Sequence, residues 1–435
     1  MTTWRAFVAL LAACALAGAA APDDARAQAL SLQQARTLAH DSNPDLRLAA
    51  LAHEAATAAL TVAGAAPNPV LTVQSFNLNP HAGIGAGSLR SKTVDSAVRL
   101  DQMFERAGKR GLRIDNATGL AAASAFDVVD ARRQLDQLVG QAYYDLLAAS
   151  ERLQIYRDSA VLFDHTVAAA RLRSKAGDLA GADVARAQVD ALRAHNDLLQ
   201  ATSAQRQARL ALALLIGQPQ LAEALMTADG WPLNPPADPA DELAADPADS
   251  TLRARPDVRA AQARVQAAES ARKMALAARS ADITVGVQLE HFPASAANGQ
   301  GSGNSVGIAL QIPLMVRYAY QGEVRAADVA LEAACERLRQ ARLQARGDID
   351  GARERVRSSG AMLRSFDASS GVLTAARRSA DAAEFAFQHG ALGIMELLDA
   401  RRSYRAVQLE ALTARAAYAS ALAQLQAALS QGPTP

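Results

Sequence analysis

Three acidic residues near two glycines are the side chains whose type and spacing could do chemistry. Glu396 and Asp399 are three positions apart and share one face of an expected helix that follows Gly390. Asp183 occupies the corresponding place after Gly177. Carboxylates at a helix start are stabilised by the helix dipole without any further role. Repeated around a symmetric pore, the same carboxylates would form rings that favour cations.

The histidines give no sign of an enzyme or a metal site. The seven histidines, which include His40, His165, His195 and His291, are scattered along the chain. None of them forms an H-E-x-x-H motif or a pair of ligands at positions i and i+4. We therefore expect histidines on the surface or on helix faces, no bound metal or cofactor, and no enzyme activity.

The composition also limits the class of protein. Half of the residues are hydrophobic but only 4% are aromatic, whereas large globular cores usually contain bulky aromatic residues. Abundant Ala, Leu, Arg and Gln favour long, closely packed helices. The formal net charge is +1 and the charges are well mixed, so no face that binds nucleic acid is expected.

Four short stretches alternate apolar and polar residues, as amphipathic strands do. The clearest is Asp282 to Glu290, and its partner runs from Ser305 to Ile312. In the first half Val94 to Asp101 alternates, and the stretch from Val70 to Leu78 is less regular. In a membrane barrel the apolar face meets lipid and the polar face lines the lumen. Four strands cannot close a barrel alone, so the barrel interpretation requires an oligomer.

Long stretches with helical spacing separate the strand pairs. A capping box at Ser31 to Gln34 starts the first helix. The stretch from Gly111 to Lys175 would span about 100 Å as one helix. Val189, Leu192 and Leu199 lie near heptad positions, which favours a coiled-coil hairpin. The expected helices are 31–63 with an interruption near Asn43-Pro44, 111–175, 182–216, 256–280, 320–388 and 394–429.

The same order of elements occurs twice. Arg255-Pro256-Asp257-Val258 echoes Asn43-Pro44-Asp45-Leu46, and Gly390 lies 213 residues after Gly177. A period this long excludes a solenoid and indicates a duplicated unit of helix, two strands, long helix, turn and helix. The predicted organisation is a first repeat at 28–228, a Pro- and Asp-rich linker at 229–250, a second repeat at 251–430 and a tail at 431–435.

The N-terminus has the pattern of a secretory signal peptide at residues 1–27. Arg5 provides a positive charge, Ala6 to Ala21 is an apolar run, and Ala25-Arg26-Ala27 fits an A-x-A cleavage site. The alternative is a lipoprotein signal, because Leu11-Ala12-Ala13-Cys14 would make Cys14 a lipidated first residue. No other run has the ~18 apolar residues of a membrane-spanning helix. The mature chain is expected to be exported without a helical anchor.

Several short motifs occur in a fixed order in the two halves. They are Asn43-Pro44, Pro67-Asn68-Pro69, Gly108-Lys109-Arg110, Arg255-Pro256, Ile312-Pro313-Leu314, Gln321-Gly322-Glu323 and the segments after Gly177 and Gly390. Together they resemble the TolC-type outer-membrane efflux protein family over nearly all of the mature chain. The resemblance implies a mainly α-helical protein whose long hairpins form a periplasmic tunnel. It also implies four strands per protomer and a homotrimer with a twelve-stranded barrel in outer-membrane lipid. The GKR and QGE elements are most similar to the heavy-metal branch that includes CzcC and CusC.

The resemblance assigns a role to the three acidic residues. Glu396, Asp399 and Asp183 match positions whose acidic side chains line the closed periplasmic aperture in the family. The position of Glu396 is often Asp there, and the longer side chain would narrow or reshape the constriction.

The resemblance also assigns roles to the hairpin turns. Gly177 and Gly390 match the hairpin tips, where a periplasmic adaptor protein joins, and φ angles above zero are expected at both. Arg171 and Lys175 would then either dock the adaptor or pair locally with Asp178.

The expected function is a passive outer-membrane duct that receives substrate from an inner-membrane pump through the adaptor. The chain has no nucleotide-binding motif, so the pump would supply the energy. Heavy-metal cations are the expected cargo, with multidrug or protein export by the same family as alternatives. A periplasmic coiled-coil adaptor or scaffold is the alternative from another class, but it would have one helical hairpin and a compact β-domain.

Overall fold

A computed structural model describes residues 28–76, 94–232, 249–293, 301–367 and 371–430. These residues form two compact units, which we call the sheet unit and the helical unit. In the sheet unit they are 48–76, 94–130, 249–293 and 301–346, and in the helical unit they are 28–47, 131–232, 347–367 and 371–430. Each unit therefore takes segments from both predicted repeats. The predicted signal peptide with Cys14, most of the linker and the tail lie outside the described residues.

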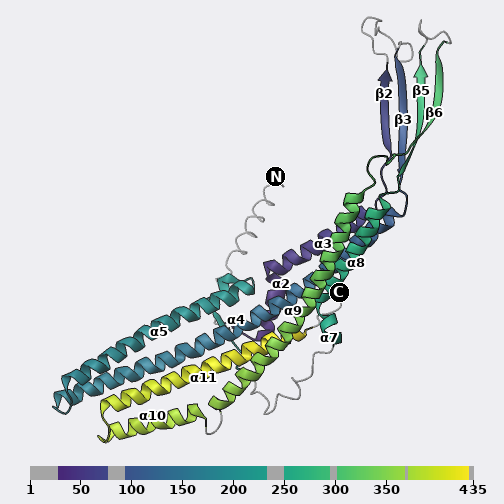
Figure 1. Ribbon diagram of the computed structural model, residues 1–435. Helices are drawn as coiled ribbons and strands as arrows, with labels where there is room; N and C mark the ends of the chain where they lie inside the picture. The colour runs from purple at the N-terminus through teal and green to yellow at the C-terminus, as the bar shows by residue number, and fades with distance from the viewer. Residues whose placement is uncertain (1–27, 77–93, 233–248, 294–300, 368–370, 431–435) are drawn as a thin grey trace, which may run out of the picture. The chain divides into compact units, whose positions relative to one another are not determined.

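Four antiparallel strands form a sheet in the order β2-β3-β5-β6 (Figure 1). They are β2 (Val70–Phe76), β3 (Asp95–Phe104), β5 (Ile283–Phe292) and β6 (Gly303–Gln311). All four predicted strands are present, close to their expected bounds. The register places Val98 opposite Val73 on one side and opposite Leu289 on the other. Side chains of the same kind therefore align across the strands.

Small residues allow close helix packing in the sheet unit. A Cβ atom at Gly119 would lie 2.9 Å from the Cβ of Ala267. Beside this contact the Asn116 side chain donates to the Ala267 carbonyl at 2.7 Å. Abundant alanine thus fills helix contacts in a chain that has few aromatic residues for its core. The helices are most of α3 (Pro44–Gly64), α7 (Asp249–Ala254), α8 (Pro256–Ala277) and the first parts of α4 (Lys109–Lys175) and α9 (Gln321–Asp367).

Basic residues at the start of α4 join the strands to the helices of the sheet unit. Lys109 forms an ion pair with Asp282 at 2.8 Å and donates to the Ser280 carbonyl at 2.7 Å. Arg110 donates to the Gly64 carbonyl at the end of α3, also at 2.7 Å. Cations near the carbonyl ends of helices are favourable. The GKR motif thus fixes the place where strands meet helices.

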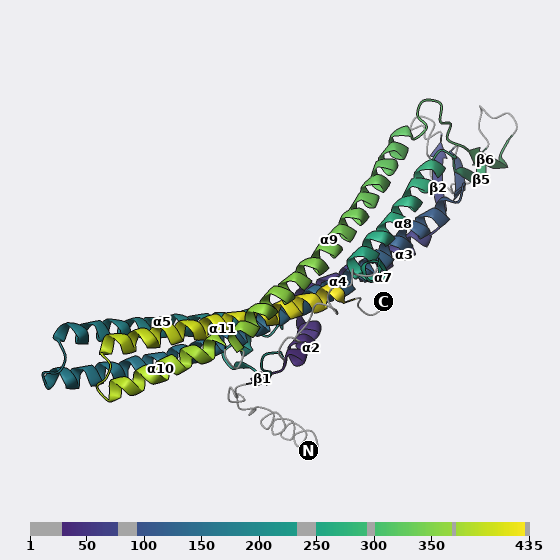
Figure 2. The ribbon, with the colours of Figure 1, turned by 60° about the horizontal axis from the view of Figure 1, so that its bottom comes forward.

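The helical unit contains two helical hairpins that run side by side (Figures 1 and 2). The first is the second part of α4 with α5 (Gly181–Leu215), and the second is α10 (Val372–Gln388) with α11 (Ile394–Leu429). Phe163 and Val167 of α4 belong to one buried cluster with Leu397 and Leu398 of α11. Burial of these side chains therefore holds the two hairpins together.

The predicted heptad side chains of α5 do not lie in the hairpin interface. Val189, Leu192 and Leu199 are exposed, Leu199 by 69%. Ala187 and Ala194 are fully buried instead. The distance between two packed helices depends on the side chains at the contact, and alanine allows a short distance. The heptad interpretation is therefore wrong for the interior of this hairpin.

The predicted single helix over 320–388 is two helices. α9 ends at Asp367, and α10 begins at Val372 with an extended Gly371 at its N-cap (φ −71°, ψ 170°). Glycine costs about 1 kcal/mol relative to alanine inside a helix, and Gly371 follows two serines. No proline marks the break, so the apolar spacing alone did not locate it.

A short parallel sheet near the start of the chain was not predicted. The Tyr143 hydroxyl donates to the Leu30 carbonyl at 3.0 Å and accepts from the Asp229 N–H at 2.9 Å. Burial raises the pKa of Tyr143 to about 12. Three-residue strands are too short for an alternating pattern to show. The remaining elements of the helical unit are β1 (Gln28–Leu30), which pairs with β4 (Leu225–Thr227), α2 (Leu32–Ser42) and η3 (Pro219–Leu221).

The two echoing helix openings are secured by different contacts. The Asn43 side chain donates to the Leu215 carbonyl at 2.9 Å. Arg255 is only 1% exposed, pairs with Asp257 at 2.7 Å and donates to the Ala345 carbonyl at 3.2 Å. The residue before each proline therefore anchors its helix start to a neighbouring helix.

Candidate functional site

One face of the sheet, the apolar face, carries no Asp, Glu, Lys or Arg in the described strands. Its side chains form rows across the strands, among them Val73, Val98, Leu289 and Val306, and Leu71, Leu100, Val287 and Ile308. These side chains are exposed, up to 83% for Ile308. An exposed apolar area of this kind marks contact with lipid or with another protein.

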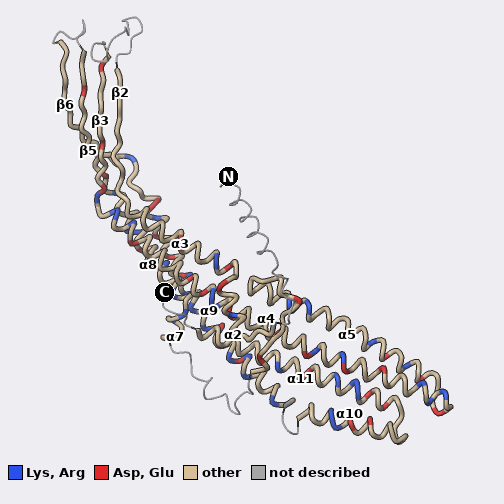
Figure 3. The backbone as a smooth tube through the Cα atoms, turned by 180° about the vertical axis from the view of Figure 1, so that it is seen from behind, with Lys and Arg blue, Asp and Glu red and all other residues tan. Residues whose placement is uncertain are grey.

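The opposite face, the polar face, carries the charges of the sheet. The register places Asp95, Arg99, Asp101 and Glu290 on it. Figure 3 shows how few charged residues lie along the strands compared with the helices. The predicted amphipathic alternation is therefore confirmed, with the charges on one side only.

Both hairpin turns end the preceding helix in the same way. Gly177 and Gly390 have φ angles of +86° and +74°, as predicted. In each turn the residue after the glycine donates its N–H to the carbonyl five positions earlier, at 2.9 Å and 2.8 Å. This is the Schellman motif, in which glycine adopts the left-handed conformation that costs other residues about 1–2 kcal/mol.

Asp183 and Glu396 are each the third residue of their helices, α5 and α11. Asp183 lies 3.6 Å from Arg186, and the Glu396 carboxylate covers Gly393, where an added Cβ would be 2.5 Å from Oε2. Glu396 and Asp399 are exposed. In the described part of the chain, no hydrogen bond or ion pair joins Asp183 to either of them. The aperture role of these acids stays a prediction that depends on further copies of the chain.

Arg173 connects the first tip to the second hairpin, whereas Arg171 donates to the Gln188 side-chain oxygen of its own hairpin at 3.0 Å. Nη2 of Arg173 donates to the Phe387 carbonyl at 2.8 Å, and the Arg173 guanidinium lies 4.3 Å from the centroid of the Phe387 ring. Arg171 and Lys175 are exposed, and neither forms an ion pair with Asp178 within the described residues. Sequence reasoning missed Arg173 because its partner lies 214 positions away.

Arg401 of α11 joins the two hairpins from a buried position. Its side chain is 7% exposed, and its Nη1 donates to the Leu162 carbonyl at 3.0 Å. It also donates to the Thr166 hydroxyl and forms an ion pair with Glu384. Partners on α4 and α10 therefore meet at one guanidinium.

Two further arginines of α11 connect the hairpins. Arg402 forms an ion pair with Asp190 of α5, and Arg405 pairs with Asp197 at 3.2 Å. Together with Arg401 we name these the hairpin links. Their spacing on one helix was the available sequence signal, but it did not reveal which acids they meet.

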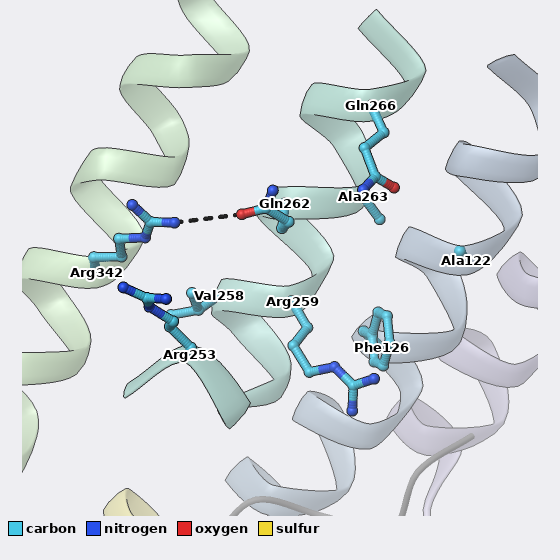
Figure 4. Close-up of a pocket in the computed structure, with 9 residues that line it drawn as sticks. All are labelled: Ala122, Phe126, Arg253, Val258, Arg259, Gln262, Ala263, Gln266 and Arg342. Atoms are coloured by element: carbon cyan, nitrogen blue, oxygen red, sulfur yellow. Dashed lines mark hydrogen bonds between the residues drawn. The ribbon is translucent and has the colours of Figure 1, made fainter. Parts of the chain in front are cut away.

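A surface cavity of about 520 Å³ lies in the sheet unit between α4, α7, α8 and α9 (Figure 4). Arg253, Arg259 and Arg342 line it, and the Arg259 guanidinium lies 4.1 Å from the centroid of the Phe126 ring. Arg342 donates to the Gln262 side chain at 3.3 Å. The lining contains no carboxylate, imidazole, thiol or hydroxyl group, and arginine stays protonated. This cavity therefore offers no general base or nucleophile.

Metal ligands and membrane-spanning helices were sought among the described residues. Within them, no group of three or more His, Cys, Asp or Glu residues could hold a metal ion. No described helix combines the length and the apolar character that crossing a membrane requires.

Known proteins share the sequence pattern over most of the chain. A sequence model of the family described as outer membrane efflux protein matches residues 35–218 and, again, residues 248–431. The cobalt-zinc-cadmium resistance protein CzcC of Cupriavidus metallidurans is 25% identical over 376 residues, which cover 86% of this chain and 84% of CzcC.

Solved structures share the fold. A membrane protein from Pseudomonas aeruginosa is similar with a TM-score of 0.76 at 22% identity, covering 92% of this chain and 93% of its own. CusC, whose crystal structures concern folding and transmembrane channel formation, has a TM-score of 0.74 at 20% identity and 92% coverage of both chains. At these identities the similarity establishes the fold alone.

Proposed function

Because this chain belongs to the outer membrane efflux protein family, we propose that three copies form one passive duct through the outer membrane. The chain is an outer-membrane efflux channel, mainly helical with few strands. The observation that carries the proposed duct is the separation of charge between the two faces of the sheet. Such a sheet suits lipid on one side and water on the other. Two hairpins in one chain also argue against a periplasmic adaptor.

The open edges of the sheet support closure with other copies. β2 and β6 are the outer strands of the four-stranded sheet, and unpaired strand edges are sites for pairing with another chain. Pairing β6 of one copy with β2 of the next would give twelve strands in a trimer, within the range of bacterial outer-membrane barrels. Two or four copies also give an even number, and the family resemblance selects three.

The proposed cargo is heavy-metal cations, because a relative over most of the chain is named for cobalt, zinc and cadmium resistance. A wide duct passes a solvated ion and needs no metal ligands. Disruption of the gene should lower tolerance to these metals and leave drug tolerance unchanged. The opposite result would assign the channel to drug export, and a neighbouring gene for a cation pump would support metals.

The proposed partners are a periplasmic adaptor and an inner-membrane pump. The turns at Gly177 and Gly390 lie at the same end of the helical unit (Figure 1), where an adaptor would reach both. Arg171 and Lys175 are exposed beside the first turn and are the proposed docking cations. The pump supplies the energy, and the duct responds passively.

The proposed gate is the helical tip, with Glu396, Asp399 and Asp183 around the aperture. The hairpin links hold the second hairpin against the first. Opening would then require these contacts to loosen so that the inner helices untwist. Threefold symmetry would repeat each carboxylate as a ring that favours cations.

Neutralising two of the acids tests the aperture. Glu396→Gln combined with Asp399→Asn should lower the cation preference or change the conductance of the purified trimer in planar bilayers, because the carboxylate rings are lost. The matched control is Asp381→Asn, an exposed acid of α10, which should leave both unchanged. Identical behaviour of the double variant and the native channel would refute the aperture assignment.

A further inference from the structure

An arginine and an aspartate form a pair on the polar face of β3. Arg99 Nε donates to Asp101 Oδ1 at 2.9 Å, and Nη2 lies 2.8 Å from the same oxygen. The two residues are two positions apart in a strand and therefore share one face. The Asp101 side chain is only 18% exposed, although this face is open in the single chain. The pair thus lies flat on the sheet.

Gly286 of the neighbouring strand provides the space for the pair. It faces Asp101 in the register of β3 and β5. A Cβ atom at Gly286 would overlap Asp101 Oδ1 and lie 3.0 Å from Arg99 Nε. At Gly307, on the same face of β6, the nearest atom to an added Cβ is 3.9 Å away. The close contact is therefore particular to Gly286.

We propose that Asp101 and Gly286 hold the charge of Arg99 against the wall of the barrel, so that the lumen prefers cations. This inference rests on the proposed function, in which the polar face lines the pore. The described strands place three carboxylates on this face, those of Asp95, Asp101 and Glu290, and one cation, Arg99. With Arg99 cancelled by Asp101, the carboxylate of Glu290 remains on this face beside a neutral neighbour, Gln288, and the trimer would repeat it as a ring. Rings of carboxylates favour cations.

The pair makes the barrel a second selectivity element, separate from the aperture at the helical tip. A free guanidinium in the lumen would oppose cation entry, because like charges repel across a pore. The cancellation therefore suits a duct whose cargo carries positive charge. It also predicts effects of opposite sign when either member of the pair is removed.

Reversal potentials in a KCl gradient test the pair, with the purified full-length trimer in planar bilayers. Asp101→Asn should shift the reversal potential away from that of K⁺, because the charge of Arg99 is no longer cancelled. Arg99→Gln should shift it toward that of K⁺, because a carboxylate is released. The double variant should return to the native value, since it removes one charge of each sign.

The two glycines give a matched test of the space beneath the pair. Gly286→Ala should displace the pair into the pore and lower both the conductance and the cation preference. Gly307→Ala, on the same face with ordinary space around it, should leave both unchanged. Equal behaviour of the two alanine variants would overturn the role of Gly286.

The measurements are repeated in the Glu396→Gln/Asp399→Asn background. In that background the ion preference of the aperture cannot hide a change in the ion preference of the barrel. If Asp101→Asn and Arg99→Gln form normal channels with unchanged reversal potentials, this inference is wrong. It is also wrong if the two reversal potentials shift in the same direction. Either result leaves the proposed function intact. A native chain that forms no conducting channel overturns the proposed function itself. Where Asp101→Asn does not assemble, Arg99→Gln and the glycine pair decide.

Discussion

The charged Arg401 side chain lies in the interior of the helical unit. It forms an ion pair with Glu384 of α10 and donates a hydrogen bond to Thr166 of α4. Hydrogen bonds to a charged group contribute about 1.5–3 kcal/mol, and Arg401 makes its bonds from a side chain that is only 7% exposed. Exposed ion pairs contribute only about 0–1 kcal/mol. Arg377, which is 71% exposed and lies 3.8 Å from Asp381, is such a pair on α10. Position, rather than residue type, therefore decides what an arginine contributes here.

Replacement of Arg401 should loosen the second hairpin. Arg401→Ala is expected to lower the local free energy of opening of α10 and α11 by about 2 kcal/mol, seen as faster amide hydrogen exchange in the detergent-solubilised protein. Its conductance in planar bilayers should also rise, because the tip opens more easily. Arg377→Ala is the control and should change neither. Native exchange rates in Arg401→Ala would show that the link does not hold the hairpins.

Close packing between helices of the sheet unit depends on small residues at particular positions. At Gly119 of α4, an added methyl group would meet the Cβ and backbone of Ala267, with the nitrogen 3.0 Å away. At Gly347 of α9 nothing lies within 4 Å of the same added atom. Alanine favours a helix by about 1 kcal/mol over glycine, but forcing extra volume into a packed contact costs about 1–3 kcal/mol. The two glycines should therefore respond to the same substitution with opposite signs.

Alanine substitution at the two glycines measures this balance. Gly119→Ala should destabilise the α4–α8 contact by about 1 kcal/mol net, and Gly347→Ala should stabilise its helix by a similar amount. Local hydrogen exchange in the solubilised protein reports both effects. If both variants became more stable, the α4–α8 packing would not require glycine.

The elements differ in how much of them the sequence reveals. Strands such as β5 were predictable because each face of the sheet has a uniform environment, so polarity alternates along the chain. The turns at Gly177 and Gly390 were predictable because a left-handed residue favours glycine. The contacts of Arg173 and Arg401 were not, because they depend on which helices of the other hairpin lie beside them. The break at Gly371 left no mark in the apolar spacing.

The features of the whole molecule converge on a membrane duct. Its sheet exposes a continuous apolar face, whereas water-soluble monomers rarely expose large apolar areas. Its polar face is charged and its two edge strands are open to further pairing. Its helices carry many charges of both signs, as helices in water do (Figure 3). Each property is awkward for an isolated soluble chain and useful in an outer-membrane oligomer.

Cysteine accessibility on β6 measures which face of the sheet meets lipid. Ser305 and Ile308 lie on opposite faces, and both are exposed in the single chain. With Cys335 replaced by Ser, the full-length protein in lipid vesicles is treated with a membrane-impermeant maleimide. We expect Ser305→Cys to react through the water-filled lumen and Ile308→Cys to be protected by lipid. Equal labelling of both positions would contradict an outer-membrane duct. So would a purified protein that stays soluble and monomeric without detergent.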